Sequence, residues 1–442
     1  MFRTFALATG FALVVCGVHP TCAEAQTPSI PTTASLSLSA SANEDVNSGD
    51  PAAGGSDLQY QGQRLSSSLQ AGLNARGGLS KMFWQVGAST GFQHYPSLHE
   101  VLPTGQSANV GIAFPVSKRT TVQVSGGLSY IPNYSLQLAP SPAAAAPTDA
   151  AQGTIPDVVP ETLVGQPDFS VVRQTARSSS ALVSISQNLG PRTSFTGSYS
   201  SQRTNFLQEG TPDLTSGNAH AAVKYQFSKY GGIHVGYGRR FGDYELASGV
   251  TPARLDDLDV GIDYNRNRQI ALSRKTTASF SSGGTIQSDE AGGRHFSLTG
   301  VANLNYAISR TSNALLSFTR GVQLVQGFAA PVSSDTLTGS LNLRPTPRAS
   351  FMASIASAKG TVGAASAGSV DNAYFAFTSS ARMSFALSRT TGMFLSYSGY
   401  QHKIGNAVVL VDHLSNLQRR QSVQVGVTTQ LPLIQAPRRG GK

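Results

Sequence analysis

Polar and apolar residues alternate along most of this chain, and each alternating segment predicts a β-strand. Residues 295–306 show the pattern clearly, because Phe296, Leu298 and Leu304 alternate with His295, Asn303 and other polar residues. A period of two over roughly 9 to 12 residues is typical of a strand longer than the usual 5 or 6. The chain therefore consists mainly of long strands.

Pairs of these segments are joined by a short turn that combines a basic residue with Ser, Thr or Gly. Residues 308–312 are Ile-Ser-Arg-Thr-Ser and residues 387–391 are Leu-Ser-Arg-Thr-Thr. Related turns are centred on Arg76, Arg119, Arg192, Lys229, Arg274 and Arg348. The turn recurs about every forty residues in most of the chain, so the repeating unit is strand, tight turn, strand and a more variable connection.

Eight turn-linked hairpins account for sixteen strands. A weak segment at 33–40 and a closing segment at 419–433 raise the count to about 18, and a count of 16 stays open if segment 33–40 and another pairing are miscounted. We predict an all-β fold, a transmembrane antiparallel up-and-down β-barrel with short periplasmic turns and long external loops. An even strand count places both ends of the barrel on the short-turn side.

The composition fits a barrel in lipid. Charged residues make up 13% of the chain, roughly half of the share in soluble globular proteins. A secreted, soluble β-rich repeat protein is disfavoured, because its outward faces would be too apolar for water. After the first residues no aliphatic run approaches the ~18 residues of a spanning helix, so only a closed barrel could satisfy the backbone within a membrane.

The sequence divides into three parts. Residues 1–25 are predicted to be a secretory signal peptide, with Arg3 before an apolar stretch and an Ala23-Glu24-Ala25 cleavage site. Residues 26–434 form the predicted barrel, and residues 435–442 form a basic tail. Both cysteines lie in the predicted leader, so the mature chain is expected to have no disulfide and no thiolate metal site.

The formal net charge of +10 does not indicate nucleic-acid binding. Many of the bases lie in the short turns, where they can face phosphate head groups, and they do not cluster with aromatic residues on one face. The expected partners are outer-membrane lipid and the barrel-insertion machinery. Formation of a homo-oligomer stays open, and no cofactor is expected.

The leader, the alternating strands, the Ser-Arg-Thr-Thr turns and the strands that end in Tyr together resemble bacterial outer-membrane β-barrel proteins of the porin-like type. The resemblance covers the whole mature chain. It implies an integral protein of the outer membrane of a Gram-negative bacterium. One departure is the end of the chain, where such barrels often finish on an aromatic residue, whereas here alternating Val and Leu lead into the tail.

Alternation also predicts which residues line the pore. It places a set of titratable side chains on the inner face of consecutive strands: His220, Lys224, His234, Arg240, Asp257, Asp259 and Asp263. Arg382 is also predicted to face inward, further round the barrel. These charges could select among ions. The favoured interpretation is that they are solvated or neutralise one another across the wall.

A second hypothesis concerns residues 132–172, a long acidic Pro/Ala-rich segment without Lys or Arg. The third loop of general porins folds into the barrel, so the resemblance implies a constriction loop. Its acids would then oppose Lys224 and Arg240 across the pore: Asp149, Asp157, Glu161 and Asp168. The composition favours the alternative of a disordered external loop.

Signals for catalysis are weak, and we predict no enzyme. Residues 87–91 match Gly-x-Ser-x-Gly around Ser89, but they lie inside an alternating segment with no helix after it. No pair of histidines has a spacing that indicates a metal site.

The leading functional prediction is a porin-like channel, either for passive passage of small solutes or for export of a polymer such as an exopolysaccharide. The alternative is a non-transport barrel that acts as an adhesin or structural protein through its external loops.

Overall fold

The computed structural model describes fifteen segments of the chain: 32–49, 62–79, 82–96, 100–131, 175–207, 213–228, 231–246, 249–264, 270–271, 275–288, 294–309, 311–324, 331–363, 372–405 and 417–434. The predicted leader (1–25), the acidic segment 132–172 and the tail (435–442) lie outside these described residues. The four predicted loop acids also lie outside the described residues: Asp149, Asp157, Glu161 and Asp168.

Almost all of the described residues are in β-strands. In chain order the strands are β1 (Thr33–Gly49), β2 (Gly62–Leu79), β3 (Met82–Tyr95), β4 (Glu100–Ser117), β5 (Thr120–Ile131), β6 (Ala176–Asn188), β7 (Thr193–Phe206), β8 (Asp213–Gln226), β9 (Gly231–Leu246), β10 (Gly249–Tyr264), β11 (Ile270–Ala271), β12 (Thr276–Ser288), β13 (Arg294–Ala307), β14 (Asn313–Gln323), β15 (Val332–Thr346), β16 (Ala349–Val362), β17 (Ala373–Ala386), β18 (Thr391–Ile404) and β19 (Leu417–Ile434).

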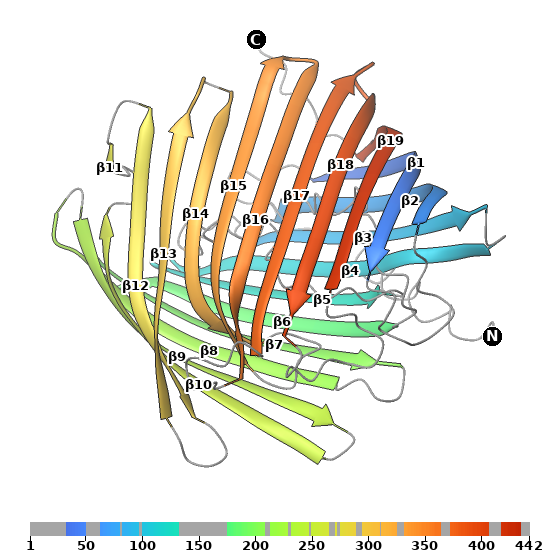
Figure 1. Cartoon of the computed structure of the whole chain (residues 1–442). Helices are drawn as coiled ribbons and strands as arrows, with labels where there is room; N and C mark the ends of the chain where they lie inside the picture. Colours follow the sequence, from blue (N-terminus) through green and yellow to red (C-terminus); the bar gives the residue numbers. More distant parts are fainter. Residues whose placement is uncertain are drawn as a thin grey trace, which may run out of the picture.

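The strands form one closed antiparallel sheet, in which each strand pairs with its neighbours along the chain (Figure 1). The ring closes because β1 pairs with both β2 and β19, with Ala34 opposite Ile434. Both β10 and the two-residue β11 pair with β12, so they share one position in the wall. Nineteen labelled strands therefore make an 18-strand barrel, which confirms the predicted fold and excludes the count of 16.

In the described part of the chain, no helix is long and apolar enough to cross a membrane.

The repeated turn is explained by its serine. The Ser117 hydroxyl accepts a hydrogen bond from the backbone N–H of Arg119 at 3.1 Å. Ser309 does the same for Thr311 at 3.2 Å, and Ser388 for Thr390 at 3.2 Å. A serine that bonds the backbone two residues ahead stabilises a tight turn in place of a ladder hydrogen bond. The recurring serine at the start of these turns is thus explained by local turn chemistry.

At the other end of the barrel, which we call the external end, the strands are longer than predicted. β1 continues to Gly49, beyond the weak segment predicted at 33–40, and it pairs with β19 along this extension. β10 likewise begins at Gly249, before the outward apolar residues Leu258 and Val260. The pattern failed here because outward positions near this end are polar, as Glu44 is, so the alternation of apolar residues stops before the strand does.

The outer face carries a band of exposed apolar side chains on nearly every strand. Phe296 is 70% exposed and Leu128 is 65% exposed, and Val235 and Val260 are about half exposed. Their strand neighbours on the inner face are mostly polar. A soluble monomer rarely exposes so large an apolar surface, whereas a barrel in a bilayer requires such a band.

Tyrosines lie towards both margins of this band. Tyr225 and Tyr306 are 44% exposed and lie next to the tight turns, while Tyr199, Tyr237 and Tyr397 lie further along their strands and are 38 to 52% exposed. Aromatic side chains with a polar tip favour the two membrane–water interfaces, so these residues fit the girdles of a membrane barrel.

Candidate functional site: a charged wall inside the barrel

Strand register brings most of the predicted pore-lining residues onto one part of the wall. On neighbouring β8 and β9, Lys224 lies opposite His234 and His220 lies opposite Gly238. On β10, Asp257 lies opposite the same glycine. All of these positions alternate with exposed apolar residues such as Val223, so they face into the barrel. We call this region of β8, β9 and β10 the charged wall.

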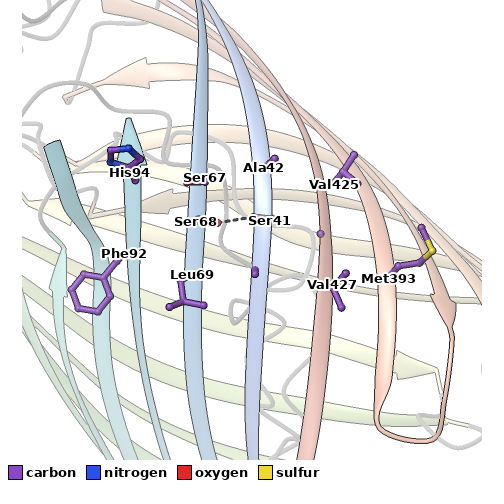
Figure 2. A pocket seen from close by; sticks show the side chains of 12 residues that line it. Ser41, Ala42, Ser67, Ser68, Leu69, Phe92, His94, Met393, Val425 and Val427 are labelled. Atoms are coloured by element: carbon purple, nitrogen blue, oxygen red, sulfur yellow. Dashed lines mark hydrogen bonds between the residues drawn. The ribbon is translucent and has the colours of Figure 1, made fainter. Parts of the chain in front are cut away.

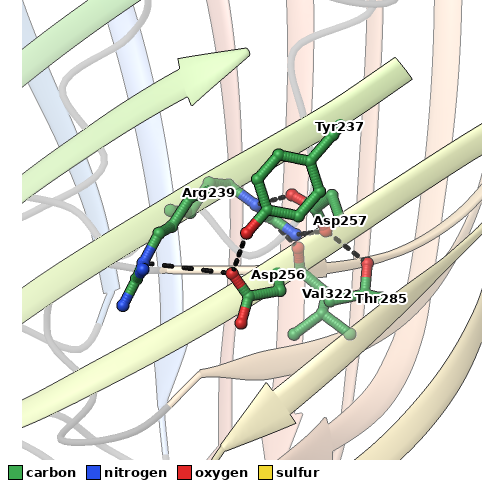
Figure 3. Close-up of polar contacts among 7 residues, drawn as sticks. Tyr237, Arg239, Asp256, Asp257, Thr285 and Val322 are labelled. Carbon is green, nitrogen blue, oxygen red and sulfur yellow. Dashed lines mark hydrogen bonds and ion pairs between the residues drawn. The ribbon is translucent and has the colours of Figure 1, made fainter. Parts of the chain in front are cut away.

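The centre of the charged wall is a bidentate ion pair between Arg240 and Asp257 (Figure 3). Arg240 Nε and Nη2 donate to the two Asp257 carboxylate oxygens at 2.5 and 2.7 Å. Thr285 of β12 donates its hydroxyl proton to Asp257 Oδ1 at 2.5 Å, and Arg240 Nη1 donates to the backbone oxygen of Val322 on β14 at 2.5 Å. The pair is about four-fifths shielded, with side-chain exposures of 21% and 23%. It joins four strands.

A second pair lies on the same wall. His234 Nε2 is 3.0 Å from Asp259 Oδ1, and the histidine is buried while the carboxylate is 42% exposed. Each of these two acids of β10 thus contacts a side chain of β9, and the Arg240–Asp257 pair is neutral as a unit. The backbone of Asp263 lies opposite Gly232, but its side chain is outside the described set.

Glycines make room for the histidines. A Cβ added to Gly236 or Gly238 would lie 3.1 or 3.2 Å from the ring of His220. At Gly261 it would lie 2.4 Å from His234 Cε1. Side chains at these positions would displace the rings, so the glycines allow both imidazoles to lie along the inner surface. Sequence analysis missed this role, although inward Gly at alternate positions of β9 was a usable signal.

The end of β14 bends into the barrel and covers the charged wall. Leu324 packs against Leu214, Tyr244 and Ala253, which are inward residues of β8, β9 and β10. A Cβ added to Gly242 would lie 2.9 Å from Leu324 Cδ1. The sequence hypothesis assigned the narrowing to residues 132–172. In the part of the chain that the structure describes, the segment that reaches across the inside of the barrel to this wall is the end of β14.

The inner wall is also closely packed near the external end. Tyr95, Tyr244, Tyr374 and Ile404 face inward on four different strands, and each is at most 7% exposed. Inward residues would be exposed if they faced a wide aqueous space. These four inward side chains are therefore covered at this level, and they leave less room in the barrel there.

Away from the charged wall the inner face is largely uncharged and rich in hydroxyl and amide groups. Ser41 and Ser68 share a hydrogen bond of 2.6 Å across β1 and β2, and Gln424 of β19 donates to Ser41 at 2.7 Å. Ser354 and Ser380 repeat the arrangement on β16 and β17 at 2.6 Å. Such cross-strand pairs leave a polar surface with little net charge.

Arg382, the remaining predicted pore residue, lies on β17 and does not join the charged wall. Its guanidinium lies 4.4 Å from the centroid of the Phe394 ring, and its Nε donates to Ser384 at 3.2 Å. This arrangement holds the arginine against its own wall.

Neither of two further features indicates catalysis. Ser89 shares a hydrogen bond of 2.7 Å with Ser107, within the β3–β4 ladder. Among the described residues, no group of three or more His, Cys, Asp or Glu side chains could hold a metal ion.

The outer face has two features that sequence analysis missed. Beside the charged wall, the outward Asp256 accepts a hydrogen bond from Tyr237 Oη at 2.7 Å and lies 3.9 Å from Arg239 (Figure 3). Near the β1–β19 seam, a hollow of about 810 Å³ opens on the outer surface (Figure 2). Its floor includes Ala40 and Ala42, which are too small to fill the space between neighbouring larger apolar side chains.

A closed barrel with an apolar outer band and a polar inner face is an integral outer-membrane protein, because only closure satisfies every strand edge in lipid. Several solved structures are similar to this chain in fold. OpdQ of Pseudomonas aeruginosa is 8% identical with a TM-score of 0.46, and the match covers 91% of this chain and 98% of that chain. OccK2 (OpdF) of the same organism, solved in complex with glucuronate, is 11% identical with a TM-score of 0.45 and coverages of 91% and 98%.

The siderophore receptor PirA from P. aeruginosa is also similar, at 9% identity and a TM-score of 0.44, covering 92% of this chain and 81% of that chain. No family model matches the sequence, and no curated protein matches it. The function proposed below therefore rests on the residues of this chain.

Proposed function

We propose that this protein is an outer-membrane channel for the passive passage of small polar solutes. The observation that carries the proposal is the polar inner face of a lipid-embedded barrel, with most of the predicted pore-lining charges on one wall. A barrel that served only as a scaffold for external loops would not need an organised set of charges in its interior.

The chemistry of the inner face favours solutes with little net charge. The Arg240–Asp257 pair cancels in sign, and the surrounding serines, threonines and glutamines offer hydrogen bonds to hydroxyl groups. The end of β14 and the packed external level narrow the path. Small solutes therefore suit this interior better than a polymer does.

The test is planar-bilayer conductance of refolded residues 26–442, after a gel-mobility change on boiling has confirmed a folded barrel. We expect ohmic steps of low conductance and a reversal potential near zero in a salt gradient. Vesicle swelling with sugars of increasing size would then define the solute limit, and free passage of long oligosaccharides would favour polymer export.

The opposing result is equally clear. A folded, heat-modifiable barrel that gives no conductance and no swelling would exclude a channel, and it would favour the adhesin or structural alternative. Strong ion selectivity would contradict the assignment to solutes of little net charge, while leaving the channel itself in place.

A further inference from the structure

Three charged residues lie side by side on the outer wall near the external end. Register places Arg320 of β14 opposite Asp335 of β15, and Asp335 opposite Lys359 of β16. These positions continue the outward alternation of the exposed residues Phe318 and Leu337, so all three side chains face away from the lumen.

The residues border a hollow of about 230 Å³. Arg320 Nε and Nη2 donate to Asp335 Oδ1 and Oδ2 at 2.6 and 2.8 Å, with the guanidinium 51% exposed and the carboxylate 22% exposed. Lys359 is exposed at the opposite side, and Ser333 and Thr361 add hydroxyl donors to the lining. The aspartate therefore holds the arginine in one orientation.

The site carries a net positive charge that can bind an anion. Its two bases exceed its one acid, and Arg320 has five N–H donors, of which two are used on Asp335. A phosphate group accepts several charge-assisted hydrogen bonds at once, and a fixed guanidinium is well suited to bind it. Lys403 adds a further positive charge nearby, two strands beyond Lys359 across Phe375.

The position of the hollow relative to the apolar band indicates which phosphate groups are within its reach. Phe318 and Leu337 lie one outward position closer to the tight turns and are 42% and 47% exposed. They belong to the apolar band that lipid chains must cover. The hollow lies at the external margin of that band, with the exposed Leu298 of β13 in its lining, and lipid head groups of the external leaflet begin at this margin.

We propose that the hollow formed by Arg320, Asp335 and Lys359 binds the phosphate of a lipid head group in the external leaflet. The site is on the outer wall, so it is independent of the channel proposed for the interior. Binding there would fix the orientation and depth of the barrel on the β14–β16 side.

The test is native mass spectrometry of the folded barrel in non-ionic detergent, titrated with phosphatidylglycerol as the phosphate-bearing lipid. Lys359→Gln is the informative variant, because it leaves the Arg320–Asp335 pair intact. We expect it to weaken binding of the first lipid about fivefold, the effect of one basic residue near an anionic surface. Lys359→Arg should restore binding.

The matched control is Arg254→Gln, which removes an exposed outward base on β10, away from the hollow. It should leave the first binding step unchanged. Equal affinities for the wild type and Lys359→Gln would overturn the proposal, and so would an equal loss in Arg254→Gln, since that would mean diffuse attraction. Tight binding of inorganic phosphate alone, without competition by the lipid, would also overturn it.

Discussion

Breaking the Arg240–Asp257 pair should change both the stability of the barrel and the sign of its ion preference. In Asp257→Ala, the arginine keeps only its bond to the Val322 carbonyl, and Thr285 loses its acceptor. Exposed ion pairs contribute about 0–1 kcal/mol, and breaking a fully buried pair costs about 3–5 kcal/mol. With side-chain exposures of 21% and 23%, we expect a loss of about 2 kcal/mol.

A double-mutant cycle with Arg240→Ala separates the pair from its surroundings. The free energy of unfolding is measured by urea titration of the barrel in lipid vesicles. Because each single variant leaves a shielded charge behind, the double variant should cost less than the sum of the singles by about 1–2 kcal/mol. In bilayers, Asp257→Ala should shift the reversal potential towards anions and Arg240→Ala towards cations, with the double variant close to the wild type.

Asp256→Ala is the matched control, because Asp256 is the next residue of β10 and faces outward. It should leave the reversal potential unchanged. Additive losses of stability in the cycle would show that the two groups do not interact. Shifts of the same sign in both single variants, or a shift in Asp256→Ala, would refute the placement of the pair on the inner wall.

Two further experiments test the covering of the charged wall and the assignment of the inner and outer faces. Gly242→Cys with Leu324→Cys should be cross-linked by a short, reducible bifunctional thiol reagent, because a Cβ at position 242 would lie 2.9 Å from the tip of the Leu324 side chain. Conductance should fall on cross-linking and recover with a reductant, and no response would contradict the inward position of β14. Val124→Arg, in the outer band of β5, should cost about 2–4 kcal/mol of unfolding free energy in vesicles. The neighbouring inward Ser125→Arg should cost far less and change conductance instead, and equal costs would mean that the faces are wrongly assigned.

Much of the architecture followed from local patterns. Period-two alternation identified the hairpins and the outward positions, because side chains of a strand point to opposite sides whatever the strand pairs with. The tight turns were recognisable for the same reason, since a serine such as Ser388 bonds to backbone within two residues. The even strand count then followed from the number of turns.

The site was only partly accessible to this reasoning. Alternation predicted that Arg240 and Asp257 lie on the same face of the sheet, but it could not predict that they form a bidentate pair. Nor could it show that Gly261 makes room for His234, because both facts depend on which residues of two strands lie opposite each other. The outward triad of Arg320, Asp335 and Lys359 was hidden for the same reason.

From the sequence alone it followed that this protein is an up-and-down barrel of 16 or 18 strands with one lipid-facing and one polar side, because those properties are set by neighbours along the chain. Tertiary structure alone decided what narrows the interior. The bond from Arg240 to Val322 joins residues 82 positions apart, and Leu324 reaches the wall only because the closed sheet curves back upon itself. Contacts of that kind depend on closure and register, which alternation does not encode.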